Sequence, residues 1–190
     1  MEIGADTTIL PGTILKGKTK IGAKCTIGPN CLIENCTIGE RVILNYVQAY
    51  ESEIEDAVKA GPFVHIRPNT HLKNGVKIGD FVEVKNSTVG EQTAIAHLTY
   101  VGDSDVGKKV NFGCGTVTVN YDGMKKQRCV IGDNCFIGLQ HQSGGTGQAG
   151  QGRLHRCGHD RYQGCAGLCT GSRTCRPEGE GGLQPPEAAG

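Results

Sequence analysis

The chain has 190 residues, with 20 Lys and Arg against 19 Asp and Glu and a formal net charge of +1. This balance argues against a nucleic acid or an anionic membrane surface as partner. No apolar run approaches the roughly 18 residues that a membrane-spanning helix needs, and no signal segment opens the chain, so we expect a cytoplasmic protein without membrane insertion.

Residues 1–138 carry pairs of an aliphatic residue and a glycine that recur at intervals of about six residues. The pairs begin at Ile3, Ile21, Ile27, Ile38, Ile78, Val89, Val101, Val106, Ile131 and Ile137. A six-residue period fits neither an amphipathic helix nor a sandwich strand, but it is typical of a parallel β-helix built from hexapeptides. We therefore predict an all-β domain over residues 1–138, with about 18 residues per coil and about seven coils.

In such a prism each hexapeptide forms one face, and its aliphatic residue points inward. The glycine of each pair is expected at a corner, where the chain turns sharply and often needs a positive φ. Cys25, Cys31, Cys36, Cys129 and Cys135 share one phase of the repeat, which predicts a slot for small packed side chains. A redox or metal role is the weaker alternative, because the sequence contains no Cys-x-x-Cys pair.

Four segments place polar side chains where a plain coil needs none. These segments are residues 61–70, 81–85, 96–103 and 111–123. Polar groups on a stacked sheet face either form a binding surface or destabilise the fold without a function. We therefore expect the functional site in these segments.

The composition changes abruptly after Gly138. Residues 139–190 contain no Ile, Val, Phe, Met or Lys but hold 13 of the 30 glycines, which predicts a disordered tail. Codons can be chosen for residues 139–148 and 152–166 so that reading one base further on yields CNTNLVAPV and GAYIAAGTTVTKDVP. Both peptides are rich in aliphatic and β-branched residues, so we interpret the tail as the product of a frameshift at Gly138. The His and Cys residues of the tail fit no standard zinc motif and are incidental on this interpretation.

Several separated motifs occur in an order and spacing that resemble a known family. They are Arg67-Pro68, Glu83 with Lys85, residues 96–103 (AHLTYVGD) and residues 120–123 (NYDG). Together they resemble the acetyltransferase domain of the GlmU family, whose members make UDP-N-acetylglucosamine with an acetyltransferase domain and a uridyltransferase domain. The resemblance covers residues 1–138 nearly end to end, and the two peptides of the shifted frame are similar to the last coils of that family. It implies a left-handed coil, a homotrimer, and acetylation of glucosamine 1-phosphate by acetyl-CoA.

The resemblance implies two catalytic residues. His97 would be the general base that removes a proton from the sugar's ammonium group as the amine attacks the acetyl-CoA thioester. An imidazole suits this task because it exchanges protons near neutral pH. Glu83 would orient the imidazole ring and favour its charged form.

Four further residues would hold the sugar phosphate by the same resemblance. Arg67 and Lys85 would bind the phosphate, the first as a planar fork and the second as a point charge. Tyr100 and Asn111 would contact the sugar, because hydroxyl and amide groups match its hydroxyls.

The resemblance places acetyl-CoA beside an excursion between Thr116 and Arg128 that breaks the repeat. Asn120 and Tyr121 lie in this excursion, and Cys114 falls at a position that contacts the co-substrate in the family. Transfer in the family is direct and no partner base is evident beside Cys114. We therefore interpret Cys114 as a buried small hydrophobe and not as a nucleophile.

Two alternatives stay open. γ-Class carbonic anhydrases are also trimeric hexapeptide solenoids, and they hold a metal through three histidines, for which His65, His71 and His97 are candidates. In the second alternative the chain is a non-catalytic solenoid fragment, because the family's last coils, which help to bind acetyl-CoA, are replaced from Leu139 onward. We favour acetyl transfer with no bound metal. The family's Mg²⁺ site belongs to the uridyltransferase domain, whose nucleotidyl loop is not found in this sequence.

Replacement of the family's last coils also leaves the solenoid without a C-terminal cap, which predicts a less stable trimer.

Overall fold

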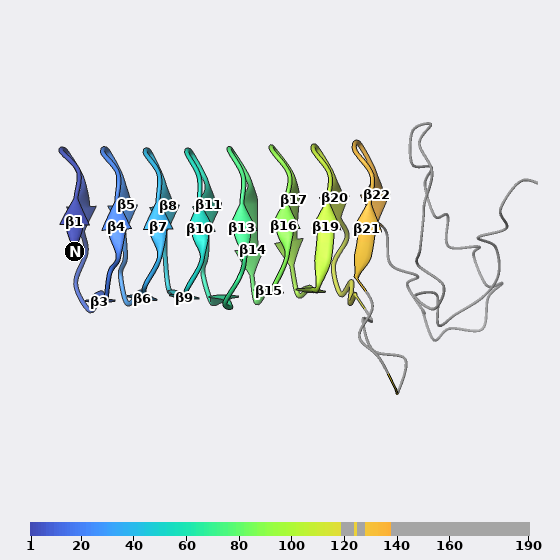
Figure 1. The fold of residues 1–190 in the computed structure, drawn as a ribbon, viewed down its shortest axis with the longest axis horizontal. Helices are drawn as coiled ribbons and strands as arrows, with labels where there is room; N and C mark the ends of the chain where they lie inside the picture. The colour runs from blue at the N-terminus through green and yellow to red at the C-terminus, as the bar shows by residue number, and fades with distance from the viewer. Residues whose placement is uncertain (119–123, 125–127, 138–190) are drawn as a thin grey trace, which may run out of the picture.

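The computed structural model describes residues 1–118, 124 and 128–137, which form a stack of similar coils (Figure 1). Each coil passes through three parallel sheets. Sheet A contains β1 (Glu2–Ile3), β4 (Lys20–Ile21), β7 (Thr37–Ile38), β10 (Glu53–Ile54), β13 (His71–Leu72), β16 (Thr88–Val89), β19 (Ser104–Val106) and β21 (Cys129–Ile131). Sheet B contains β2 (Thr8–Ile9), β5 (Thr26–Ile27), β8 (Ile43–Leu44), β11 (Lys59–Ala60), β14 (Lys77–Asp80), β17 (Ala94–His97), β20 (Asn111–Phe112) and β22 (Phe136–Ile137). Sheet C contains β3 (Ile14–Lys16), β6 (Leu32–Glu34), β9 (Val47–Tyr50), β12 (Val64–Ile66), β15 (Glu83–Lys85) and β18 (Tyr100–Gly102).

The strand register confirms the predicted parallel solenoid of about seven coils. Glu2 pairs with Lys20 and Lys20 pairs with Thr37, so each coil returns to the same face after a similar length of chain. The last step in sheet A is longer, because Asp105 pairs with Val130. The predicted excursion accounts for the extra length, and in the described residues β18 is the last strand of sheet C, one coil before the excursion.

Each sheet turns one row of aliphatic side chains inward. The row of sheet A consists of Ile21, Ile38, Ile54, Leu72, Val89, Val106 and Ile131, all at most 5% exposed. Burying one side chain of this size stabilises the fold by about 1.5–3 kcal/mol, so the inward rows hold the coils together. Ile3 and Ile9 occupy the same phase in the first coil but are 48% and 36% exposed. No coil of the described chain covers them.

Most of the paired glycines are needed for a reason other than the expected one. Among the paired glycines that the structure describes, only Gly28 has a left-handed φ, of 113°. A Cβ atom on Gly90 would lie 2.8 Å from the backbone nitrogen of Lys108 in the next coil, and closer still to the carbonyl group of Gly107. The predicted positive φ is therefore wrong for most pairs. Glycine is required because two coils approach too closely there to admit a side chain.

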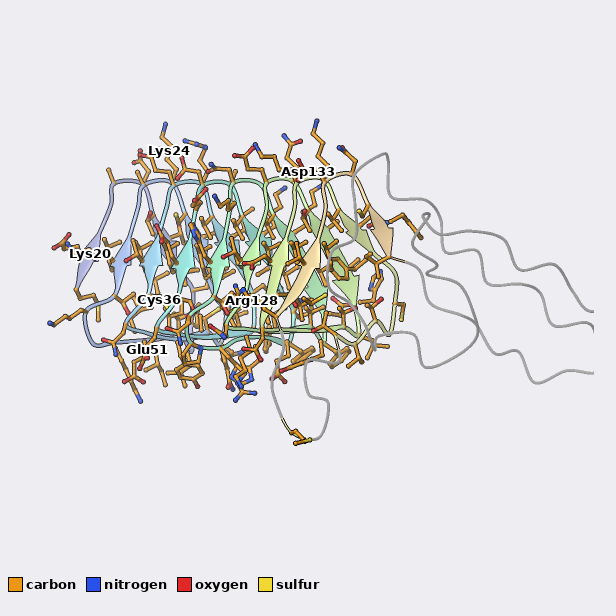
Figure 2. All side chains as sticks on the ribbon, turned by 45° about the vertical axis from the view of Figure 1, so that its right-hand side comes forward. Lys20, Lys24, Cys36, Glu51, Arg128 and Asp133 are labelled. Carbon is orange, nitrogen blue, oxygen red and sulfur yellow. The ribbon has the colours of Figure 1, made fainter. Side chains whose placement is uncertain are left out.

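Seven of the eight residues at the left-handed corner position between sheets A and B are not glycine. This position is filled in successive coils by Asp6, Lys24, Arg41, Ala57, Gly75, Gln92, Lys109 and Asn134. Lys24 and Asp133, the neighbour of Asn134, lie along the same edge of the stack (Figure 2). The turn itself therefore does not demand glycine at this position.

The five cysteines of the repeat are buried as predicted. Cys25, Cys31, Cys36, Cys129 and Cys135 are all free and at most 4% exposed. Burial raises the pKa of the Cys31 and Cys36 thiols. All five cysteines belong to the hydrophobic core cluster, which confirms the packing role.

Cys36 and Cys129 also belong to a buried row of hydroxyl and thiol side chains at the corner between sheets C and A. Its members are Thr19, Cys36, Ser52, Thr70, Ser87, Ser104 and Cys129, each at most 7% exposed. Ser87 illustrates the pattern: its Oγ donates to the Lys85 carbonyl at 2.7 Å and accepts from the Ser104 amide at 2.9 Å. The row thus satisfies backbone groups at a corner where the strands end.

Residues 139–190 lie outside the described residues, so the tail and its shifted frame stay predictions. The handedness of the coil and the trimer also stay predictions. Within residues 1–118, 124 and 128–137, no helix has the length and apolar character that crossing a membrane requires.

Candidate functional site

The outer face of sheet C carries two rows of polar side chains. In the first row His65 pairs in register with Glu83, and Glu83 pairs with Tyr100. In the second row Arg67, which directly follows β12, lies beside Lys85 at the end of β15. Because neighbouring strands are about 4.8 Å apart, these side chains are neighbours from coil to coil. Four of the predicted site residues therefore share one face.

Arg67 and Glu83 form the ion pair of this face. Arg67 Nη1 donates to Glu83 Oε1 at 2.8 Å, and the two side chains are 39% and 36% exposed. This hydrogen bond raises the pKa of the Arg67 guanidinium. A pair with this exposure contributes about 0–1 kcal/mol to stability, so its main effect is to orient the guanidinium.

His97 lies on a different sheet from Glu83. It is the last residue of β17 in sheet B, opposite Asp80 of β14, and it is exposed. Within the described residues its imidazole makes no hydrogen bond or ion pair. The prediction that Glu83 orients His97 is therefore not supported within one chain, because the Glu83 carboxylate is bonded to Arg67 instead.

Backbone contacts fix the corner at which His97 stands. The Thr99 hydroxyl donates to the His97 carbonyl at 2.7 Å, and the Leu98 amide donates to the Asp80 carbonyl at 2.9 Å. The side chain of Thr99 is buried. These bonds place the imidazole at the edge of sheet B that leads into sheet C.

Asn111 is on the outer face of sheet B, one strand beyond His97. It begins β20, where it pairs in register with Ala94 of β17, and its side chain is exposed. The predicted site residues therefore form two groups. His97 and Asn111 lie on sheet B, and Arg67, Glu83, Lys85 and Tyr100 lie on sheet C.

The three predicted acetyl-CoA contacts are described only in part. Cys114 is exposed, so the interpretation of its side chain as a buried small hydrophobe is wrong. It follows β20 in the turn after Phe112, where sheet B leads toward sheet C. Asn120 and Tyr121 lie outside the described residues.

Both ends of the excursion are anchored on the preceding coil. At its start, the Thr118 hydroxyl accepts from the Gly102 amide at 2.7 Å. At its end, Arg128 Nε and Nη2 donate to the two carboxylate oxygens of Asp105 at 2.6 and 2.7 Å. Arg128 Nη1 also donates to the Asn86 carbonyl at 3.0 Å. Arg128 thus joins three segments of the chain, and its hydrogen bonds lower the pKa of Asp105.

Tyr50 and His65 were not assigned to the sugar-phosphate site from the sequence. Their rings contact edge to face with centroids 5.8 Å apart, on the strands next to Arg67 and Glu83. Both could have been found by counting back one coil, because Tyr50 stands one coil before Arg67 and His65 one coil before Glu83. Asp80, opposite His97, is found by the same rule.

The three histidines of the metal alternative lie on three different sheets. His65 is on sheet C, His71 on sheet A and His97 on sheet B. His71 is already engaged, since its Nε2 lies 2.7 Å from Glu55 Oε1. Among the described residues no three His, Cys, Asp or Glu side chains of one chain converge as metal ligands would.

Comparisons with known proteins bear on this arrangement. A family model described as bacterial transferase hexapeptide (six repeats) matches residues 1–35. The bifunctional protein GlmU of Clostridium botulinum (strain ATCC 19397 / Type A) is 51% identical over 138 residues, which is 73% of this chain and 30% of that protein. GlmU of Thermoanaerobacter pseudethanolicus (strain ATCC 33223 / 39E) is 56% identical over 138 residues with the same coverage. The chain is a homologue of the GlmU acetyltransferase region.

The GlmU homologue spans 30% of the length of the GlmU proteins that it matches. Among solved structures, the acetyltransferase domain of PglB from Neisseria gonorrhoeae FA1090 in complex with acetyl coenzyme A is 22% identical, with a TM-score of 0.21. That match covers 73% of this chain and 54% of the PglB domain. A similarity this low carries no inference about the site, so the family assignment rests on GlmU.

Proposed function

We propose that this GlmU homologue carries a glucosamine-1-phosphate acetyltransferase site. The reaction transfers the acetyl group of acetyl-CoA to the amine of glucosamine 1-phosphate and yields N-acetylglucosamine 1-phosphate. The observation that carries the proposal is the 51% identity to a GlmU protein over 138 residues. The two groups of polar side chains on sheets B and C supply the chemistry that this reaction needs.

His97 acts as the general base. It takes a proton from the substrate's ammonium group, and the freed amine attacks the thioester carbonyl carbon. A C–N bond forms, the C–S bond breaks, and the sulfur leaves with a proton as free CoA. The exposed position of His97 at the edge of sheet B leaves its ring open to both substrates.

The sheet C group binds the sugar phosphate. Arg67 and Lys85 neutralise the phosphate, and the Arg67–Glu83 hydrogen bond keeps the guanidinium on this face. Tyr100 contacts the sugar from the neighbouring strand, and Asn111 contacts it from sheet B. Glu83 is thereby assigned to positioning Arg67.

Acetyl-CoA is the co-substrate in this proposal, with Cys114, Asn120 and Tyr121 as its contacts. The exposure of Cys114 leaves its side chain available for such a contact. The functional assembly is a homotrimer in the cytoplasm. Mg²⁺ belongs only to the uridyltransferase activity of full-length GlmU and takes no part in this site.

Release of free CoA thiol from acetyl-CoA in the presence of glucosamine 1-phosphate tests the proposal. His97→Ala should lower the rate by about 10²-fold or more, the range expected for losing a general base. His71→Ala is the matched control, because His71 lies on sheet A and is bonded to Glu55. Equal rates for the two variants would remove His97 from the mechanism.

The shifted frame is tested in the same assay. We propose that residues 1–138 hold the sugar-phosphate site and that the coils encoded one base further on complete the acetyl-CoA site. A chain whose residues after Gly138 follow that frame should release CoA faster than the present chain. If neither chain is active, the non-catalytic solenoid fragment replaces the proposed enzyme.

A further inference from the structure

The outer face of sheet C contains a glycine, Gly102, whose surroundings differ from those of Gly90. A Cβ atom on Gly90 would meet backbone atoms of the next coil. A Cβ atom on Gly102 would instead meet the Tyr100 hydroxyl oxygen, with Tyr100 Cζ at 2.6 Å and Cε1 at 2.7 Å. The three nearest atoms all belong to this one side chain. The Tyr100 ring therefore occupies the space that a side chain at position 102 would fill.

The ring reaches this space because Tyr100 and Gly102 share a face of β18. Alternate residues of a strand point to the same side of the sheet, so the Tyr100 side chain can fold along its own strand onto Gly102. Gly102 is buried and Tyr100 is half-buried, as expected for a ring that covers the glycine. The φ of Gly102 is not in the left-handed region. The backbone therefore does not require glycine here, and the ring supplies the reason for it.

The folded ring carries the Tyr100 hydroxyl from the first row of the site into the second. Tyr100 starts in the first row, in register with Glu83, whereas Gly102 lies in register with Lys85 of the second row. Arg67 belongs to the same row, one strand beyond Lys85. The Tyr100 phenol also contributes, after the Glu83 carboxylate, to the raised pKa of the Arg67 guanidinium. A hydroxyl donor thus lies in the row of the two cations.

Hydrogen bonds on both sides hold the backbone of β18 in place. On one side the Asp103 amide donates to the Lys85 carbonyl at 3.0 Å. On the other side the Gly102 amide donates to the Thr118 hydroxyl at 2.7 Å, and the Thr118 amide donates to the Tyr100 carbonyl at 2.9 Å. The side chain of Thr118 is buried. A methyl group added to Gly102 would therefore displace the Tyr100 ring and leave the strand where it is.

We propose that Gly102 is a positioning residue of the sugar-phosphate site, because it leaves the space that holds the Tyr100 hydroxyl beside Arg67 and Lys85. The identity of the ligand rests on the proposed function, and the position of the ring rests on the contacts given above. Any side chain at position 102 turns the ring away from this row. Since only the end of one side chain has to move, such a substitution removes the ligand contact and keeps the fold.

Titration calorimetry of the full chain with glucosamine 1-phosphate tests this role in four proteins. These are wild type, Gly102→Ala, Tyr100→Phe and the double variant. Each single substitution should weaken binding by about 3–10-fold, the effect of losing one hydrogen bond. The double variant should bind no more weakly than the weaker single variant, because both changes remove the same contact.

A matched glycine controls for general effects of the added methyl group. Gly75→Ala places that group in open space, 3.7 Å from Gln92 Cγ on a different part of the coil, and should bind as wild type does. The urea midpoint of Gly102→Ala should stay at the wild-type value. A loss of affinity without a loss of stability separates positioning of Tyr100 from a merely structural role.

The outcomes separate this inference from the proposed function. Wild-type affinity in Gly102→Ala or in Tyr100→Phe would overturn the inference, and so would a double variant whose loss is the product of the two single losses. If the wild-type chain does not bind glucosamine 1-phosphate, the sugar-phosphate site of the proposed function is refuted. A crystal structure of Gly102→Ala then decides the positioning by itself. A ring turned away from Arg67 and Lys85 would support it, and a ring still folded along β18 would overturn it.

Discussion

Replacing Gly90 with alanine should destabilise the solenoid more than replacing Gly75, although Gly75 has the left-handed backbone. Gly90 stands where two coils meet, and the atoms nearest to an added methyl group are backbone atoms of Gly107 and Lys108. Gly75 has a φ of 68°, yet the nearest atom to an added methyl group is Gln92 Cγ at 3.7 Å. Comparing Gly90→Ala with Gly75→Ala therefore tests whether glycine is required by the close approach of the coils or by the left-handed backbone.

The expected magnitudes differ by a factor of two or more. At Gly90 the methyl group would lie 2.8 Å from Lys108 N, against an ordinary contact distance of about 3.5–4.0 Å. Forcing the coils apart costs about 1–3 kcal/mol. Straining the 2.9 Å bond from the Thr93 hydroxyl to the Gly107 carbonyl costs about 1 kcal/mol more, which brings the total to about 2–4 kcal/mol.

At Gly75 the cost should be about 1 kcal/mol or less, because reduced freedom of the unfolded chain offsets part of the left-handed penalty. The preceding coil supports this, since Ala57 occupies the same corner position with φ of 55°. Urea unfolding followed by circular dichroism measures both variants, and the chain contains no Trp to serve as a fluorescence probe. A Gly75→Ala cost equal to or above that of Gly90→Ala would refute the reasoning.

Two further predictions concern buried and charged contacts of the coils. Ser87→Ala removes the acceptor of the buried Ser104 amide and should lower the free energy of unfolding in urea by about 1–3 kcal/mol. Ser87→Cys should cost less, because Cys36 and Cys129 occupy equivalent positions. Equal costs for the two variants would contradict the role of the buried hydroxyl and thiol row in satisfying backbone groups. Arg128 lowers the pKa of Asp105 in the folded state, so the pair stabilises the fold above the ordinary Asp pKa, and this contribution is lost as pH falls through the lowered value. Unfolding free energy should therefore decrease more on acidification from about pH 6 to pH 3 in wild type than in Asp105→Asn, and parallel curves would show that the pair has no such effect.

The repeat itself could be predicted because each coil depends on its own residues. An aliphatic residue every six positions puts one apolar side chain inward on each face, whichever coil precedes it. The buried cysteines follow from the same phase. The role of the glycines could not be predicted in this way, because the space beside Gly90 depends on how closely the next coil approaches.

The candidate site was predictable in part. Arg67, Glu83, Lys85 and Tyr100 were singled out by their motifs, and the structure places them on one face. The orientation of His97 by Glu83 stays a prediction; within one chain Glu83 bonds to Arg67, because the strand register and not the sequence distance decides which side chains meet. Cys114 was expected to be buried and is exposed, since it stands in a turn outside the inward phase.

The amino-acid sequence by itself determined the period, the inward rows and the positions at which polar groups interrupt them. Each of these depends on residues within one or two hexapeptides. The tertiary structure decided which side chains meet: Arg67 bonds to Glu83, His97 stands on another sheet, and the Phe63 and Phe81 rings of successive coils stack. These relations depend on the length of each coil and hence on the strand register, because a shift of one residue moves a side chain to the opposite face of its strand.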